Sequence, residues 1–333
     1  MILMLVSLIF RSKKRKEFSI ENVFLSLVPS LIKADYNVSC DYLPNGRYNS
    51  FFSILQNVLF VMGIRADIYH ITGETYFMVL ALLRKKTILT IHDMVMLEKS
   101  KGVKKFLFEK FWFELPIRYA TAVTVISEKT KKEIENYFPK IKRNIHIIPN
   151  PYGDYLHTVI KHFNSNCPII LVVGTRDNKN LERIIYAAAG LKCKLDIIGN
   201  LSENQLKILS ENKIVFYNSY NLSNKEVFEH YVNCDIVCFP SLYEGFGMPI
   251  IEAQKVGRVV ITSNLQPMCD VAGKGAILVN PYDYLDIRKA IIQATQNAEL
   301  RNRLIELGIK NTEKYSPETI ADLYKQIYET TVL

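Results

Sequence analysis

The stretch DIVCFPSLYEGFGMPIIEA, residues 235–253, combines a strand, a loop with two glycines and the start of a helix. The apolar run before Pro240 predicts the strand, and Pro249 predicts the first helical position. Open α/β sheets bind ligands in loops of this kind, at the carboxyl end of a parallel strand. Gly245 and Gly247 let backbone N–H groups approach a ligand, and the helix directs its positive end to the same place. The stretch therefore predicts an α/β fold with a phosphate site.

Two acidic residues bracket this loop. Glu244 precedes the predicted helix, and Glu252 is expected in its first turn. One carboxylate can accept hydrogen bonds from ribose hydroxyls while the other faces a sugar that develops positive charge. Alternatively, both acids complement the helix dipole. The spacing of the two glutamates leaves both interpretations open.

Strand and helix patterns alternate along the chain and restart near its middle. Such alternation predicts βαβ units and parallel sheets. Turn-forming residues cluster at 149–154, so we place a linker there. We expect two Rossmann-like doubly wound parallel-sheet domains, residues 1–151 and 152–315, that face a cleft. The predicted strands are 1–10, 67–70, 87–92, 122–127, 145–149, 169–174, 194–199, 214–217, 235–240, 259–263 and 276–279.

The composition is that of a globular protein. Of 333 residues, 49% are hydrophobic and 23% are charged, and no run reaches the roughly 18 apolar residues that a membrane span needs. The basic run at 11–16 follows the apolar start instead of preceding it, which is the wrong order for a signal peptide. The six cysteines show neither a Cys-x-x-Cys pair nor ligand spacing with histidine. We therefore expect reduced thiols and a cytoplasmic location.

The positive charge is concentrated in the amino-terminal half. The net charge is +9, but residues 1–150 contain 23 Lys and Arg against 13 Asp and Glu, and the remainder carries −1. This asymmetry predicts that the first half meets an anionic surface or ligand.

Segment 99–118 combines lysines with aromatic residues, a pattern typical of a helix at a membrane surface. A core-packed helix with a solvated lysine face is an alternative. Nucleic acid is not expected as a partner, because none of the usual binding motifs occurs. We predict peripheral association with the inner face of the plasma membrane through Lys101, Lys104, Lys105, Phe106 and Trp112.

Other motifs follow one another in a recognisable order. They are Thr90-Ile-His-Asp93, Val125-Ile-Ser-Glu128, Ile148-Pro-Asn150, Val173-Gly-Thr175 with Lys179-Asn-Leu181, and Asn280-Pro281. With Glu244 to Glu252, they make the chain resemble the retaining glycosyltransferases of family 4, also called group 1, over about residues 65–325. The resemblance implies the GT-B fold and transfer of a sugar from a nucleotide donor to an acceptor hydroxyl, with retention of configuration. A lipid-linked saccharide of bacterial polysaccharide synthesis is the expected acceptor.

The resemblance also implies roles in the second domain, which is expected to bind the nucleotide sugar. Glu252 binds the donor ribose, and Glu244 lies at the reacting centre. Lys179 and Arg176 hold the diphosphate, although solvated loop cations are an alternative. Two cations can stabilise the leaving group without a metal, so we expect no cofactor and no metal. The other expected donor-binding residues are Gly174, Gly245, Phe246, Gly247, Tyr217 and Asn218.

The first domain is expected to bind the acceptor, with the helix at about 316–333 packing back on it. His92 ends an apolar run and, by resemblance, contacts the transferred sugar; a histidine satisfied by the backbone is the alternative. His70 and Asp93 are expected on the acceptor side. The loop at 10–16 contains no glycine, whereas the family usually has a glycine-rich loop there.

The sequence is also compatible with two other functions. A sugar-nucleotide epimerase or a phosphorylase would use the same fold, and a nonenzymatic nucleotide-binding protein would use the same phosphate loop. Free sugar-nucleotide interconversion distinguishes the epimerase, and donor hydrolysis without acceptor distinguishes a transferase from a binding protein.

Overall fold

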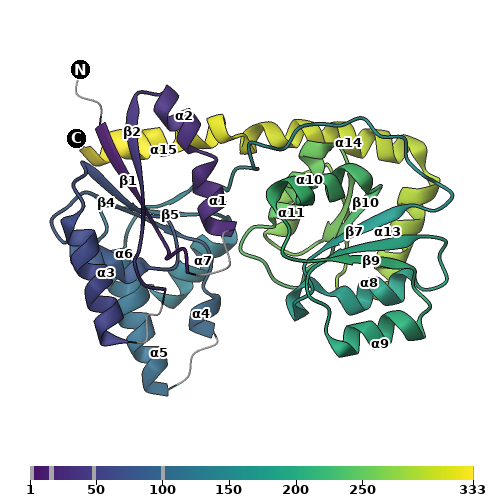
Figure 1. The fold of residues 1–333 in the computed structure, drawn as a ribbon, viewed down its shortest axis with the longest axis horizontal. Coiled ribbons are helices and arrows are strands. Elements are labelled where there is room, and N and C mark those ends of the chain that lie inside the picture. Colours follow the sequence, from purple (N-terminus) through teal and green to yellow (C-terminus); the bar gives the residue numbers. More distant parts are fainter. Residues whose placement is uncertain (1–3, 15–18, 47–49, 99–101, 333) are drawn as a thin grey trace. The chain divides into compact units, whose positions relative to one another are not determined.

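The computed structural model describes residues 4–14, 19–46, 50–98 and 102–332, and the chain divides into two compact units. Unit 1 consists of Met1–Pro151 and Ser316–Leu333, and unit 2 is Tyr152–Tyr315. The carboxyl-terminal helix therefore belongs to the same unit as the amino-terminal strands (Figure 1).

The described part of unit 1 contains six parallel strands in the order β2-β1-β3-β4-β5-β6. β2 was missed by the sequence prediction because it lies at the edge of the sheet and is mostly half-buried. It therefore lacks the continuous apolar run that marks a buried parallel strand. The strands are Met4–Phe10 (β1), Tyr36–Tyr42 (β2), Ile68–Ile71 (β3), Thr87–Ile91 (β4), Ala122–Val125 (β5) and Ile145–Ile147 (β6).

Helices cover both faces of this sheet. The connections β1 to β2 and β2 to β3 run in opposite directions across the sheet, and right-handed crossovers then place their helices on opposite faces. Figure 1 shows α15 beside α2 on one face and α3 with α6 on the other. The first face carries Ser19–Leu25 (α1), Val28–Lys33 (α2) and Pro317–Val332 (α15). The second carries Phe51–Gly63 (α3), Tyr76–Leu82 (η1), Val95–Glu98 (α4), Gly102–Phe108 (α5), the π-helical Glu109–Glu114 (η2), Leu115–Tyr119 (α6) and Glu128–Tyr137 (α7).

The described residues of unit 2 form a second six-stranded parallel sheet, in the order β12-β11-β10-β7-β8-β9. β9 begins two residues later than expected, because Lys213 adopts a left-handed conformation and the chain turns before the strand. The strands are Ile169–Val173 (β7), Lys194–Ile198 (β8), Phe216–Ser219 (β9), Ile236–Phe239 (β10), Val259–Ser263 (β11) and Ile277–Val279 (β12).

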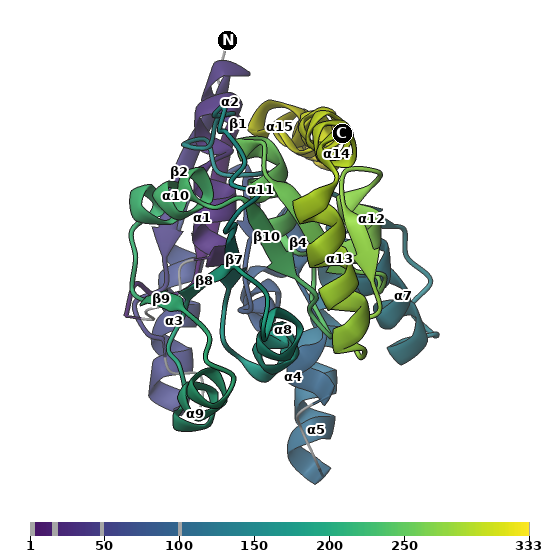
Figure 2. The same cartoon turned by 90° about the vertical axis from the view of Figure 1, so that its right-hand side faces the viewer.

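Helices also flank both faces of the second sheet. α8 and α13 pack side by side over one face, and α11 packs against α14 on the other (Figure 2). These elements are Asp177–Lys179 (η3), Leu181–Ala188 (α8), Glu203–Glu211 (α9), Asn224–Asn233 (α10), Met248–Val256 (α11), Met268–Ala272 (α12), Tyr284–Gln296 (α13), Ala298–Thr312 (α14) and Glu313–Tyr315 (η4).

The two parallel sheets confirm the predicted doubly wound α/β class. Serine side chains also cap helices in both units. Ser223 caps α10 in a capping box with Glu226, and Ser316 accepts a hydrogen bond from the Thr319 N–H at the start of α15. Within the described ranges, every helix is too short or too polar to pass through a bilayer.

Candidate functional site

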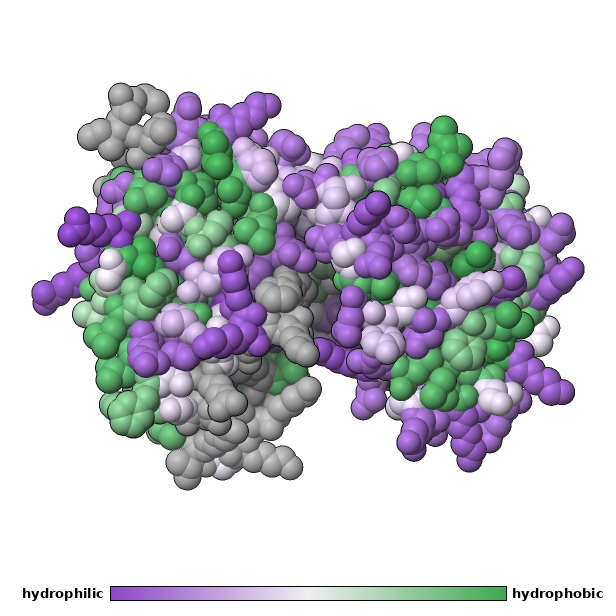
Figure 3. All heavy atoms as spheres, in the orientation of Figure 1, coloured by the Kyte–Doolittle hydropathy of each residue, from purple (hydrophilic) through white to green (hydrophobic). Residues whose placement is uncertain are grey.

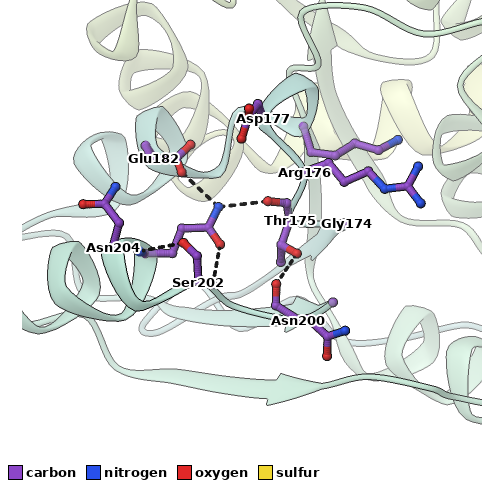
Figure 4. Close-up of a pocket in the computed structure, with 11 residues that line it drawn as sticks. Gly174, Thr175, Arg176, Asp177, Glu182, Asn200, Ser202 and Asn204 are labelled. Atoms are coloured by element: carbon purple, nitrogen blue, oxygen red, sulfur yellow. Dashed lines mark hydrogen bonds between the residues drawn. The ribbon is translucent and has the colours of Figure 1, made fainter. Parts of the chain in front are cut away.

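A pocket of about 610 Å3 opens at the carboxyl ends of β7 and β8 in unit 2. Parallel sheets present backbone groups and loop side chains at this edge, so it is the expected place for a ligand. Figure 4 shows the side chains around it. The pocket is lined by Gly174, Thr175, Arg176, Asp177, Lys179, Glu182, Gly199, Asn200, Ser202, Asn204 and Gln205.

Two glycines shape the floor of this pocket. Gly174 has φ 94° and Gly199 has φ 142°, conformations that L side chains rarely adopt. A Cβ on Gly174 would lie 3.0 Å from Lys179 Cγ, and one on Gly199 would lie 2.8 Å from Thr175 Cγ2. A side chain at either position would therefore strain the backbone and crowd the pocket wall.

Gln205 holds the wall of the pocket in place. Its Nε2 donates to Thr175 O and to Glu182 Oε1, each at 2.9 Å (Figure 4). Its Oε1 accepts from the Ser202 N–H as part of a capping box at the start of α9. The sequence prediction missed Gln205, although the Ser-x-x-Gln spacing was a readable signal.

Lys179 and Glu244, both predicted site residues, form an ion pair at this edge of the sheet. Lys179 Nζ lies 2.6 Å from Glu244 Oε1, and the two side chains are 20% and 14% exposed. The ammonium group also lies 4.6 Å from the centre of the Phe239 ring. Each charge is thus neutralised by the other, and a diphosphate that engages Lys179 would compete with Glu244.

Asn178, which the sequence prediction missed, connects the two loops that carry this pair. Its Nδ2 donates to Tyr243 O at 2.9 Å and to Glu244 Oε1 at 3.3 Å. The Leu242 N–H donates back to Asn178 O. These bonds fix the position of Glu244 relative to Lys179.

Arg176 is exposed and lines the pocket. Figure 4 shows its side chain extending away from the bonds around Gln205. From this position the guanidinium can contact a ligand in the pocket.

The glycine loop before α11 differs in detail from the prediction. Gly247 has φ 110° and is the N-cap of α11, so Pro249 occupies the second helical position instead of the first. Glu252 consequently lies in the second turn, where the helix dipole acts weakly. Phe246 is buried, with its ring 5.6 Å from Tyr315 in an edge-on contact. Only the backbone of Phe246 and Gly245 is then available to a donor.

Glu252 is half-buried and bonded to a residue that the sequence prediction missed. The hydroxyl of Tyr231, on α10, donates to Glu252 Oε2 at 2.7 Å. Burial raises the pKa of Glu252, and the Tyr231 hydrogen bond and the charge of Lys179 lower it in part. Tyr231 thus orients this carboxylate and favours its ionised form.

Tyr217 and Asn218 lie on β9, away from the pocket lining. The Asn218 amide donates to Ile197 O and Gly199 O, at 2.9 and 2.8 Å. The Tyr217 hydroxyl accepts from Lys194 Nζ at 3.3 Å. Asn218 therefore supports the backbone at the end of β8, and its side chain is already occupied.

His92 lies at the carboxyl edge of the unit 1 sheet. Its ring is almost fully buried, and its Nε2 donates to Thr72 O at 2.8 Å. Burial lowers the pKa of His92, so the neutral ring leaves Nδ1 as an acceptor. The adjacent Asp93 accepts from the Val95 N–H, and burial raises its pKa.

His70 is enclosed by α15, which does not suit an acceptor-side role. It is completely buried, with Nδ1 2.9 Å from the Tyr328 hydroxyl and Nε2 2.7 Å from Thr90 Oγ1. Burial, with a smaller effect of His92, lowers the pKa of His70 to about 3. Both ring nitrogens are occupied, so neither is available to an acceptor.

The loop after β1 holds a buried ion pair where the family has glycines. Arg11 donates to Glu21 through Nε at 2.9 Å and Nη2 at 2.8 Å, and to Glu74 at 3.2 Å. Burial alone would lower the pKa of Arg11, but Glu21 and Glu74 raise it overall. Arg11 is thus a structural cation.

The predicted membrane segment is only partly exposed. Trp112 is 8% exposed and its Nε1 donates to Glu74 O at 2.8 Å, so its assignment to a membrane surface is wrong. The ring is held in the core by stacking on Phe108. Lys105 pairs with Glu109, and Phe106 is exposed. Lys101 and the side chain of Lys104 lie outside the described residues.

Comparison with known families agrees with this architecture. The model of glycosyl transferases group 1 matches residues 158–311, and the model of Glycosyltransferase Family 4 matches residues 21–152. The chain belongs to glycosyltransferase family 4. The predicted family is therefore confirmed, and with it the GT-B fold.

Two curated proteins share sequence with this chain. The serotype-specific mannosyltransferase WbdA of Escherichia coli is 24% identical over 72% of this chain and 32% of its own length. The N,N'-diacetylbacillosaminyl-diphospho-undecaprenol alpha-1,3-N-acetylgalactosaminyltransferase of Campylobacter jejuni is 26% identical over 50% of this chain and 45% of its own. The chain thus spans about a third of the length of the first of these relatives.

A solved structure shows the same fold. Anabaena Alr3699/HepE, crystallised in complex with UDP and glucose, superposes with a TM-score of 0.77 over 98% of this chain and 100% of its own, at 11% identity. The family 4 fold is therefore retained where little sequence is shared.

Proposed function

We propose that this protein is a hexosyltransferase that moves a sugar from a nucleotide sugar to a hydroxyl of a lipid-linked saccharide during bacterial polysaccharide synthesis. The observation that carries the proposal is the Lys179–Glu244 pair beside a glycine-floored pocket of unit 2. A cation for the diphosphate and a carboxylate for the sugar are thereby held within one hydrogen bond of each other.

On this proposal, the donor lies in unit 2. Lys179 and Arg176 bind the diphosphate, and its arrival releases Glu244 toward the sugar, where positive charge develops in the transition state. Glu252, oriented by Tyr231, accepts the ribose hydroxyls. Backbone N–H groups at Gly174, Gly245 and Gly247 complete the phosphate contacts, with the base near Tyr217 and Asn218.

Unit 1 would bind the acceptor. His92 presents a neutral Nδ1 that can accept a hydrogen bond from a hydroxyl of the transferred sugar, and Asp93 lies beside it on the acceptor side. The printed name of the Campylobacter relative includes a diphospho-undecaprenol acceptor, and that of WbdA a mannosyl transfer. These names support a lipid-linked acceptor and a hexose donor. On this proposal, the protein acts at the cytoplasmic face of the inner membrane.

A panel of UDP-, GDP-, ADP- and dTDP-sugars tests the donor class. A bound donor at 100 times its Kd adds about 2.7 kcal/mol to the stability of unit 2. We expect one base to raise the unfolding temperature and to support slow hydrolysis without acceptor. Stabilisation without hydrolysis or transfer would favour the binding protein, and interconversion of free sugar nucleotides would favour the epimerase.

We propose that the anomeric configuration is retained. In this proposal no carboxylate forms a covalent intermediate with the sugar, and the leaving phosphate takes the proton of an acceptor that attacks from the same face. NMR of the first-formed product should show the donor's anomer, and an inverted product would contradict this part of the proposal.

We further propose that transfer needs no metal ion. Lys179 and Arg176 would supply the positive charge that a departing diphosphate needs. Turnover should be unchanged by EDTA, and loss of turnover that Mg2+ or Mn2+ restores would contradict the proposal.

A further inference from the structure

The outer face of α3 in unit 1 is largely apolar, with Gln56 as an exposed polar side chain that accepts a hydrogen bond from Asn45 Nδ2. Its 13 residues, FFSILQNVLFVMG, contain no charged side chain. Ile54, Val58 and Val61 pack on the core, whereas the opposite side is exposed to solvent. The exposed fractions are 73% for Phe51, 75% for Phe52, 59% for Leu59 and 61% for Met62. Figure 3 shows hydrophobic side chains gathered over this helix, at the lower left.

α7 lies over the same sheet face, but unlike α3 it exposes charged side chains to solvent. Its sequence, EKTKKEIENY, places Glu128, Lys132 and Glu135 at exposed positions. Large contiguous apolar patches on a protein surface mark interaction sites, whereas single exposed apolar residues do not. The outer face of α3 is therefore expected to be an interaction site.

Cations lie at the end of α3. Arg65 follows the helix, and Arg84 and Lys85 precede β4; all three are exposed. The pairing of Tyr69 with Thr87 brings the amino ends of β3 and β4 together, so these cations share one edge of the unit. Leu83, 53% exposed, adds an apolar side chain to them.

We infer that the outer face of α3 inserts into the surface of an anionic lipid bilayer, with Arg65, Arg84 and Lys85 against the headgroups. A 13-residue helix is about 20 Å long, which is too short for the roughly 30 Å hydrocarbon core. It lies in the plane of the interface, as amphipathic interfacial helices do. Acyl chains cover the apolar face while lipid phosphates neutralise the cations.

A second copy of the chain fits this surface less well. A symmetric pairing through α3 would bring the same cation group of both copies to one interface, where like charges oppose association. Among the described lysine side chains of the predicted membrane segment, those of Lys105 and Lys110 are less available to lipid phosphates, because they already pair with Glu109 and Glu114. α3 is thus the principal contact, in place of that segment.

The orientation of α3 suits binding of a lipid-linked acceptor by unit 1. The helix follows β2, so Phe51 and Phe52 lie toward the carboxyl edge of the sheet, the edge at which His92 and Asp93 follow β4. A bilayer held at this end brings a lipid-anchored acceptor to the unit assigned to bind it. In this respect the inference rests on the proposed function.

Vesicle binding tests the inference. Wild type should co-sediment with phosphatidylglycerol/phosphatidylcholine vesicles, and F51Q/F52Q/L59Q should lower the partition coefficient at least about tenfold. R65Q/R84Q/K85Q should remove most of the preference for phosphatidylglycerol-containing vesicles over pure phosphatidylcholine vesicles.

The matched control is Y282Q/L285Q. It replaces side chains that are 60% and 56% exposed in unit 2 and should bind vesicles as wild type does. All replaced residues are exposed, and unchanged thermal midpoints would show that the variants are folded.

Two results would overturn the inference. One is a partition coefficient of F51Q/F52Q/L59Q equal to that of wild type. The other is a lipid-free dimer that this variant converts to a monomer, since the face would then bind a second copy. The assay contains neither donor nor acceptor, so its failure leaves the transferase proposal intact, and failure of transfer leaves the vesicle result intact.

Discussion

The two parallel sheets end differently at their carboxyl edges. In unit 1, Arg11 and Glu21 fill the edge with a pair in which both side chains are 3% exposed. In unit 2, glycines at the corresponding edge leave a pocket beside Lys179 and Glu244, whose charges remain within reach of solvent. An ion pair is thus sealed from solvent at the edge of one sheet and lies beside an open pocket at the edge of the other.

Burial explains the difference. A fully buried charge cannot exchange its partner for a ligand without leaving the first partner unsatisfied. A partly exposed pair can, because water solvates the released group. We therefore expect changes at the unit 1 pair to alter stability and changes at the unit 2 residues to alter kinetics.

The largest effect is expected from Arg11→Met. Removing the guanidinium leaves the carboxylate of Glu21 buried without its partner, at a cost of about 3–5 kcal/mol in the free energy of unfolding. Trp112 is the only tryptophan of the sequence and is buried in unit 1, so its fluorescence during urea unfolding reports this unit.

Arg118→Met is the matched control for that measurement. Arg118 is 51% exposed and pairs with Glu114 on the protein surface, so the change should cost no more than about 1 kcal/mol. Equal losses for the two arginines would remove the distinction between the two edges.

Glu244→Gln should have the next largest effect, on turnover. Loss of a carboxylate that acts mainly in the transition state should lower kcat about a hundredfold or more. Donor Kd should not rise, because Lys179 loses the carboxylate that competes with the diphosphate. Calorimetric donor binding and initial rates separate the two terms. Wild-type turnover would mean that Glu244 only complements Lys179 and the helix dipole.

Glu252→Gln should act on donor binding. Losing a charged hydrogen bond to ribose should cost about 1.5–3 kcal/mol, seen as a higher donor KM with a smaller change in kcat. A fall in kcat that exceeds the rise in KM would place Glu252 at the reacting centre and reverse the two roles.

Tyr231→Phe should give the smallest effect, about 1 kcal/mol in donor affinity. Ionised Glu252 is needed to accept ribose hydroxyls, so affinity is present above its pKa and falls as the pH drops through it. The Tyr231 bond lowers this raised pKa, so its loss should move the acid limb of donor Kd to higher pH. Tyr324→Phe, in unit 1, is the control, and identical pH profiles for all three proteins would deny Tyr231 a positioning role.

Much of the fold was readable from the sequence because buried parallel strands carry continuous apolar runs. β2 was missed because its polar residues alternate at an edge. The π-helical turn at Glu109–Glu114 explains another failure: it accompanies the inward placement of Trp112, which helical spacing alone cannot foresee.

The candidate site was readable where a residue type is dictated by backbone geometry or by charge. Gly174, Gly247, Lys179 and Glu244 were named from motifs, and the structure brings Lys179 and Glu244 together. Residues that act through tertiary hydrogen bonds were not foreseen. Gln205, Asn178 and Tyr231 are ordinary helix or loop residues in sequence, and their partners lie 21 to 66 positions away.

α15 makes unit 1 discontinuous in the chain, and this fixes an order of assembly. During synthesis, all of unit 2 leaves the ribosome before the helix that covers His70 and packs Tyr328 against Tyr36. Unit 2 can complete its own core as a continuous segment, whereas unit 1 waits with an uncovered aromatic surface. On the ribosome, α15 can therefore cover the amino-terminal sheet only after all of unit 2 has been made.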